Sequence, residues 1–171
     1  MPVQRLNHAV LYVRDVERSV AFYSDVLGFR TVASLPGAAF LQAEGSSNDH
    51  DLGLFGVGAD AADSPAGRGT VGLYHLAWEV DTLDELQRLA GALSAAGALA
   101  GASDHATTKA LYAKDPDGIE FEVSWLVPAD LITDDVRARK AVIERLDLAA
   151  DKARYGGDTP GGIGVSVAAA R

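Results

Sequence analysis

The chain of 171 residues contains no cysteine, and its basic side chains are fewer than its acidic ones, 15 against 24. Without thiolates it can form neither a disulfide framework nor a cysteine metal site, so any metal must be bound by His, Asp or Glu. The formal net charge of −9 argues against nucleic acid or an anionic membrane as a partner, because both require a basic face. Small molecules and other proteins remain as partners.

The first residues also lack a basic segment followed by a long apolar run. We therefore expect no signal peptide and no membrane span, and a cytoplasmic location. Hydrophobic residues make up 48% of the sequence, which is enough to fill the core of one domain, or of two small similar units that share a core.

The first half of the chain predicts a strand, a helix and three further strands. Asp15 stands where a helix N-cap belongs, and an apolar stripe at helical spacing follows it as far as Gly28. The strands are expected at residues 6–13, 29–33, 39–44 and about 50–57.

The same order of elements returns after residues 58–72, which are rich in Gly, Ala, Asp and Pro and predict a linker. A capping box from Thr82 to Glu85 starts the second helix, and Gly97 should end it. Its buried stripe is expected to consist of Leu83, Leu86, Leu89 and Leu93. The strands of this half are expected at residues 73–80, 99–101, 107–113 and 119–125.

The stretch from Leu111 to Trp125 joins a tight turn to a strand that carries acidic residues. In the turn, Asp115 can accept backbone hydrogen bonds and Gly118 adopts a conformation that other residues resist. The side chains after the turn alternate, which places branched and aromatic residues on one face and Glu120 and Glu122 on the other. This second face either meets water or lines a polar cavity, and Glu120 is expected in water or in a surface ion pair.

The two halves form an internal repeat, because His8 and His75 hold equivalent places 67 residues apart. Two copies of a half-barrel sheet can pair edge to edge and close around a common cavity. Residues on the concave faces of the first and last strands would then converge. The candidates for a shared site are His8, His75 and Glu122, and the predicted fold class is α+β.

Several motifs resemble those of the vicinal oxygen chelate superfamily, which includes glyoxalases, bleomycin resistance proteins and dioxygenases. They are L-N-H-x-x-L-x-V, A-F-Y-x-D-V-L-G-F, Y-H-L-A-W and K-D-P-D-G-I-E-F-E, within residues 4–126. The resemblance implies two tandem βαβββ modules, at about 4–58 and 71–126 with a linker at 59–70, in a cup-shaped open barrel around a divalent metal. It also implies that His8, His75 and Glu122 are the metal ligands.

Two imidazoles and one carboxylate leave neighbouring coordination positions open, as in the facial sites of non-haem Fe(II) oxygenases. Glyoxalase I and methylmalonyl-CoA epimerase take a fourth protein ligand from the last strand of the first module. Here that strand, residues 52–58, offers no ligand after Asp51. This difference favours a three-ligand centre.

The stretch D-H-x-x-x-x-x-x-Y is similar to one found in small type I extradiol dioxygenases of the catechol 2,3-dioxygenase kind. The resemblance implies that dioxygen opens a catecholic ring at Fe(II). It also implies that His105 and Tyr112 hydrogen-bond the substrate oxygens. His50 would stabilise the negative charge that develops on oxygen and donate a proton, a task that suits a side chain whose pKa lies near neutrality.

Other interpretations stay open at this point. The same three side chains could hold Mn(II), Zn(II) or Ni(II) in a lyase or transferase of the glyoxalase or fosfomycin-resistance type. A metal-free binding protein of the bleomycin-sequestering type is less compatible with three retained ligands. Taken singly, His50 and His105 could be exposed and idle in polar loops, and Tyr112 could simply pack in the sheet.

Residues 127–171 follow the repeat as a C-terminal extension. Thr133 predicts the N-cap of a helix with an apolar side formed by Val136, Ile143, Leu146 and Ala150. This helix could pack across the cup or pair with another copy, and we expect a homo-oligomer, a dimer or higher. The last 16 residues are rich in Gly and predict a flexible tail.

Overall fold

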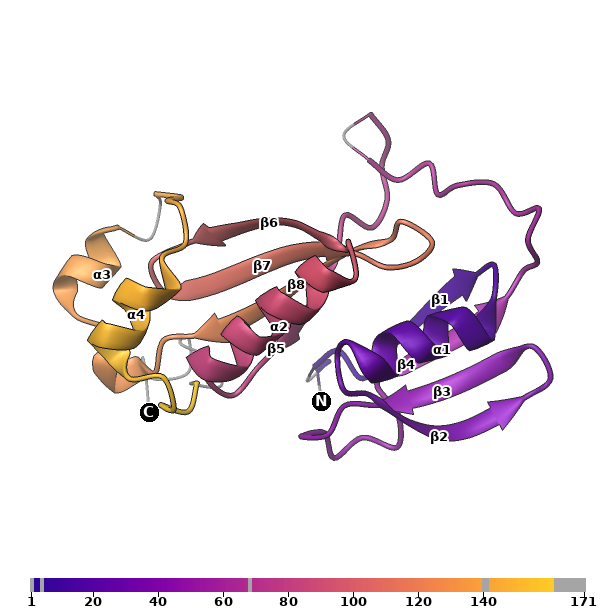
Figure 1. Cartoon of the computed structure of the whole chain (residues 1–171), viewed down its shortest axis with the longest axis horizontal. Helices are drawn as coiled ribbons and strands as arrows, with labels where there is room; N and C mark the ends of the chain where they lie inside the picture. The colour runs from indigo at the N-terminus through magenta and orange to yellow at the C-terminus, as the bar shows by residue number, and fades with distance from the viewer. Residues whose placement is uncertain (1, 4, 68, 140–141, 162–171) are drawn as a thin grey trace. The chain divides into compact units, whose positions relative to one another are not determined.

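The structure is a computed structural model that describes residues 2–3, 5–67, 69–139 and 142–161 (Figure 1). The chain divides into two compact units. The first comprises Met1–Pro65 together with the turn Asp115–Gly118, and the second comprises Ala66–Lys114 and Ile119–Arg171. Among the described residues, no helix has the length and apolar character needed to cross a membrane.

The first unit is a four-stranded sheet with one helix. Its elements are β1 (Ala9–Val13), α1 (Val16–Asp25), β2 (Arg30–Leu35), β3 (Ala38–Gln42) and β4 (Leu52–Gly56). The strand order is β1-β4-β3-β2, in which β1 runs parallel to β4 and the other pairs are antiparallel.

The second unit repeats this arrangement. Its first elements are β5 (Leu76–Glu79), α2 (Leu83–Ala95), β6 (Leu99–Asp104), β7 (Thr108–Lys114) and β8 (Glu120–Leu126), in the sheet order β5-β8-β7-β6. Again the first and last strands pair in parallel. Both β1 and β5, and both α1 and α2, start 67 residues apart (76 − 9 and 83 − 16). The predicted α+β fold of two βαβββ modules is confirmed.

Local sequence signals explain where the two helices begin and end. The Asp15 side chain accepts a hydrogen bond from the backbone of Arg18, and the Thr82 side chain accepts one from the backbone of Glu85, as expected of N-caps. Gly97 follows α2 with φ of +67°, a conformation that costs glycine little. The four leucines predicted for the buried stripe of α2 are between 0 and 2% exposed.

Some boundaries differ from the predicted ones. The first strand begins at Ala9 rather than Leu6, so His8 lies immediately before it, and His75 lies immediately before β5 in the same way. The weakly predicted strand at residues 99–101 extends to Asp104. In β8, Phe121 and Val123 are 1% exposed while Glu120 forms a surface ion pair with Lys114, as the alternating pattern predicted.

The C-terminal extension is not the single helix that its apolar pattern predicted. Thr133 does cap a helix, but α3 (Asp134–Ala138) is short, and α4 (Leu148–Tyr155) is a separate helix that follows the 3-10 turn η1 (Ala129–Leu131) and α3. Between α3 and α4, the backbone of Glu144 forms an isolated β-bridge with Asp104 at the end of β6. The backbone next to Ile143 therefore bonds to a strand and is not helical, which interrupts the predicted helix.

The extension packs on the second unit. Helix α4 contacts α2, the rings of Trp125 and Tyr155 lie 5.6 Å apart, and the indole of Trp125 donates to the carbonyl of Thr159. The first residues of the predicted flexible tail thus make defined contacts, including a hydrogen bond from Asp84 to the carbonyl of Gly157. The rest of that tail, residues 162–171, lies outside the described residues.

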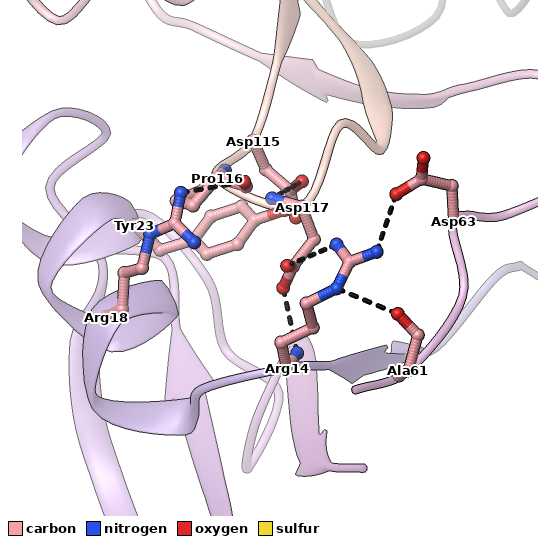
Figure 2. A network of polar contacts seen from close by, with 8 residues as sticks. All are labelled: Arg14, Arg18, Tyr23, Ala61, Asp63, Asp115, Pro116 and Asp117. Atoms are coloured by element: carbon pink, nitrogen blue, oxygen red, sulfur yellow. Dashed lines mark hydrogen bonds and ion pairs between the residues drawn. The ribbon is translucent and has the colours of Figure 1, made fainter. Parts of the chain in front are cut away.

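The turn Asp115–Gly118 packs within the first unit through a network of polar contacts (Figure 2). The guanidinium of Arg14 contacts the carboxylates of Asp63 at 2.5 Å and Asp117 at 3.0 Å. The hydroxyl of Tyr23 donates to Asp115 at 3.2 Å. Burial, reinforced by the Asp115 carboxylate, raises the pKa of Tyr23 far above its ordinary value.

Candidate metal and substrate site

Two of the three candidate ligands meet in the second unit. Nε2 of His75 lies 3.4 Å from a carboxylate oxygen of Glu122. The parallel pairing of β5 with β8 brings them together, because Leu76, next to His75, pairs with Phe121, next to Glu122. Two donors that each lie about 2.1 Å from one cation, at angles of roughly 90–110°, are about 3.0–3.4 Å apart. The observed separation fits two ligands of one metal ion.

The surroundings of this pair are compatible with a ligand role. The side chains of His75 and Glu122 are 26% and 13% exposed, so both are largely shielded but can be reached. Nδ1 of His75 is buried and has no hydrogen-bond partner among the described residues. An imidazole and a carboxylate suit Fe(II), Mn(II) and Zn(II) alike, so the donor set fits a divalent ion without selecting one.

Tyr112 and His105 lie on the same side of the second sheet as Glu122. Tyr112 is the direct register partner of Glu122 in the β7–β8 ladder, so their side chains share a face. The Tyr112 hydroxyl is 2.8 Å from Nε2 of His105. The structure thus brings four predicted site residues into one cluster, since the rings of His75 and Tyr112 are also in contact, with centroids 6.1 Å apart.

Ser103 completes this cluster and was not identified from the sequence. Its hydroxyl lies 2.8 Å from Nε2 of His105 and donates to Tyr112 at 3.3 Å. Burial raises the pKa of the Tyr112 hydroxyl, the bond with Ser103 opposes this rise, and the negative charge of Glu122 adds to it. The sequence does show Ser103 two residues before His105. A serine in a strand is common, however, and does not by itself indicate a site residue.

The other two predicted site residues, His8 and His50, meet in the first unit with ring centroids 4.6 Å apart. They immediately precede two neighbouring parallel strands, since Ala9 of β1 pairs with Leu52 of β4. His8 is exposed and His50 is half-buried. The ring of Phe40 packs edge-on against His50 at 5.1 Å, which gives the histidine an apolar neighbour.

A hydrogen-bonded loop holds His8 and His50 near each other. The amide of Asn48 donates both to the carbonyl of Asn7 and to the carboxylate of Asp51. Asp51 also accepts from the backbone of Ala43 and from the hydroxyl of Ser46. With its carboxylate engaged in this way, Asp51 is committed to the loop rather than available as a fourth metal ligand.

The three candidate ligands are divided between the units, with His8 in the first and His75 and Glu122 in the second. Within residues 2–3, 5–67, 69–139 and 142–161, no group of three or more His, Cys, Asp or Glu side chains is arranged to hold a metal ion. The second unit thus brings two of the candidate ligands together, and the set of three remains a prediction.

Comparison with known proteins identifies relatives of the chain. The profile of the Glyoxalase/Bleomycin resistance protein/Dioxygenase superfamily matches residues 5–123. A catechol-2,3-dioxygenase of Bacillus subtilis is 34% identical over 118 residues, which are 69% of this chain and 40% of that protein. Biphenyl-2,3-diol 1,2-dioxygenase 3 of Rhodococcus globerulus is 32% identical over 135 residues, which are 76% of this chain and 68% of that protein. The chain thus spans less than half the length of the Bacillus relative.

Solved structures share the fold. A lactoylglutathione lyase from Agrobacterium tumefaciens is 26% identical, covers 72% of this chain and 95% of its own, and has a TM-score of 0.53. A fosfomycin resistance protein from Listeria monocytogenes is 16% identical, covers 80% of this chain and 99% of its own, and has a TM-score of 0.55. At 16% identity, the similarity to the fosfomycin resistance protein concerns the fold alone.

Proposed function

Because the chain belongs to the glyoxalase/bleomycin resistance protein/dioxygenase superfamily, we propose that it is a metal-dependent extradiol dioxygenase that opens a catecholic ring. The relatives at 34% and 32% identity, named as a catechol-2,3-dioxygenase and a biphenyl-2,3-diol 1,2-dioxygenase, support this choice. The substrates would be a small catechol and dioxygen, and both oxygen atoms would enter the ring-opened product.

The proposed metal ligands are His8, His75 and Glu122. When bound, Fe(II) would supply the redox chemistry and lower the pKa of the catechol hydroxyls. Mn(II) is an alternative ion, since a 2,3-dihydroxybiphenyl 1,2-dioxygenase from Geobacillus genomosp. 3, 26% identical to this chain, is described as manganese-dependent. The 3.4 Å approach of His75 to Glu122 is the observation that supports a shared ion.

The remaining site residues would orient the substrate and move protons. His105 and Tyr112 are hydrogen-bonded to each other at 2.8 Å and can present a donor to a substrate oxygen. Like any tyrosine, Tyr112 is protonated at neutral pH, and burial raises the pKa of its hydroxyl further, so it can donate to an oxygen anion rather than repel it. His50 would deliver a proton, and its neighbour Phe40 offers an aromatic ring that could pack against the ring of a substrate.

The observation that carries the proposal is the arrangement of His105 and Tyr112 beside the His75–Glu122 pair. In this arrangement, hydrogen-bond donors lie next to two of the proposed metal ligands on one face of the second sheet. Anaerobic reconstitution with Fe(II), followed by a panel of catechols and air, tests the proposal. A yellow ring-fission product that needs both metal and air is expected, and metal-loaded protein that yields none with any catechol would contradict the proposal.

A lyase or transferase of the same superfamily is the second candidate. The 26% identity to a lactoylglutathione lyase favours it. The engagement of Asp51 by three donors argues against the fourth protein ligand that such a centre would take from the first module. Loading with Zn(II) or Ni(II) and assaying the hemithioacetal of methylglyoxal and glutathione separates the two, because only the lyase would turn it over.

A further inference from the structure

A lysine with 1% exposure lies behind the loop that carries His105. Nζ of Lys109 is 2.6 Å from a carboxylate oxygen of Asp104 and 2.9 Å from one of Asp151. Asp104 ends β6 and is the register partner of Lys109 on β7, whereas Asp151 comes from α4 in the C-terminal extension. A charge is rarely buried this completely unless partners of opposite charge surround it. We call Asp104, Lys109 and Asp151 the buried ion cluster.

The buried ion cluster acts on the His105 loop through Asp104. The second carboxylate oxygen of Asp104 accepts a hydrogen bond of 2.7 Å from the backbone of Ala106. Ala106 has φ of +64° and is the only residue other than glycine with positive φ among those the structure describes. A side chain disfavours this conformation, so something must hold it in place. The hydrogen bond that Ala106 donates to Asp104 stabilises this conformation directly next to His105.

The C-terminal extension holds Asp104 from a second direction as well. The backbone N–H of Asp104 donates to the carbonyl of Glu144, and the N–H of Glu144 donates back, both at 2.9 Å. Asp104 is therefore fixed by Glu144 through its backbone and by Lys109 through its side chain. Asp151 completes the cluster, and burial raises the pKa of its carboxyl while Lys109 lowers it.

Alternation along the strands separates the cluster from the reacting groups. Ser103 and Tyr112 point to the face that carries Glu122, whereas Asp104 and Lys109 point to the opposite face, where Asp151 of α4 pairs with Lys109. Asp104 is joined to the His105 loop by its peptide bond to His105 and by the hydrogen bond that its carboxylate accepts from the backbone of Ala106. None of the cluster residues therefore needs to touch a substrate in order to influence His105.

We infer that the C-terminal extension positions His105. Asp104, Lys109 and Asp151 are positioning residues that stabilise the conformation of the His105 loop from the face of the sheet opposite Tyr112. This inference rests on the proposed function for the catalytic role of His105. The packing of the loop itself can be tested without turnover. The positioning role would assign a function to the C-terminal extension, which lies beyond the residues matched by the superfamily profile.

The test uses the full chain with Asp151→Asn, which keeps the shape of the side chain and removes its charge. Lys152→Gln is the matched control, because Lys152 lies next to Asp151 on α4 but pairs with Asp84 on α2. In the metal-free protein, imidazole nitrogen and proton NMR signals report the hydrogen bond of His105. We expect Asp151→Asn to broaden or shift the His105 signals, and Lys152→Gln to leave them unchanged.

In the Fe(II)-loaded protein, Asp151→Asn should lower kcat about 10- to 100-fold with a much smaller change in KM, because the loop is displaced while the metal ligands remain. Adding Ala106→Gly should restore part of the loss, since glycine accepts positive φ without support. Unchanged His105 signals in Asp151→Asn would overturn the inference, and so would a loss of kcat that Ala106→Gly fails to relieve. If the wild type cleaves no catechol, the proposed function fails and the NMR comparison still decides the positioning role.

Discussion

The hydroxyl oxygen of Tyr112 lies 2.8 Å from Nε2 of His105, although the two side chains come from a strand and from the loop before it. Ser103 contacts both groups, so either partner can be held in one orientation while the other binds a substrate oxygen. Such a pair can donate or accept a proton without moving, which is what a group that positions a catechol requires.

Removing the Tyr112 hydroxyl should therefore impair turnover more than metal binding. For Tyr112→Phe we expect kcat to fall by about 10²-fold or more, within the range for a positioned proton donor, with Fe(II) affinity unchanged. Steady-state kinetics and metal titration measure the two effects. Tyr155→Phe is the matched control, because the buried Tyr155 hydroxyl has no hydrogen-bond partner among the described residues. Equal loss in both variants would contradict a specific role for Tyr112.

The loop that precedes β4 should depend on the carboxylate of Asp51. Its three hydrogen bonds to the loop disappear in Asp51→Ala, which leaves the half-buried backbone N–H of Ala43 without this acceptor. We expect a loss of about 1–3 kcal/mol in the free energy of unfolding, and a lower kcat because His50 is displaced. Urea denaturation measures the stability. The exposed Asp60→Ala serves as control, and the prediction is wrong if both variants unfold alike.

Tyr23 should make the stability of the first unit depend on pH in the alkaline range. Its pKa is raised in the folded state, while the unfolded chain ionises near the ordinary value of about 10. The stability that protonated Tyr23 contributes is thus fully present below pH of about 10 and declines above it, by up to about 1.4 kcal/mol per pH unit.

The comparison of wild type with Tyr23→Phe isolates this effect. Below pH of about 9, the wild type should be the more stable by about 1 kcal/mol, because Tyr23 donates to Asp115. Above pH of about 10 the difference should shrink and then reverse, since only the wild type pays for keeping a phenol protonated. Denaturant titrations over pH 8 to 11 provide the measurement. A difference that stays constant over this range would show that Tyr23 ionises equally in both states.

Much of the fold could be predicted because its signals are local. The alternation after Gly118 assigned Phe121 to the core and Glu122 to the other face, and the leucine spacing assigned the buried side of α2. The equivalent places of His8 and His75 indicated the repeat, and each does lie directly before the first strand of its unit. Such patterns need only the periods of strand and helix.

The contacts that were missed join residues far apart in the sequence. Nothing in the local pattern pairs Lys109 with Asp151, or Arg14 with Asp117, and lysine is ordinarily expected at the surface. The C-terminal extension was mispredicted for the same reason. An apolar spacing that suited one helix through Ile143 was overridden when Glu144 paired with Asp104 at the edge of β6.

The proposed metal centre requires that His8, His75 and Glu122 bind one and the same ion. Anaerobic titration of Fe(II) into the wild type and into His8→Ala, His75→Ala and Glu122→Gln tests it most directly, with Glu120→Gln as the control on the same strand. We expect one ion per chain in the wild type and in Glu120→Gln, and an affinity at least about 100-fold lower in each ligand variant. Wild-type affinity in His8→Ala would contradict the claim.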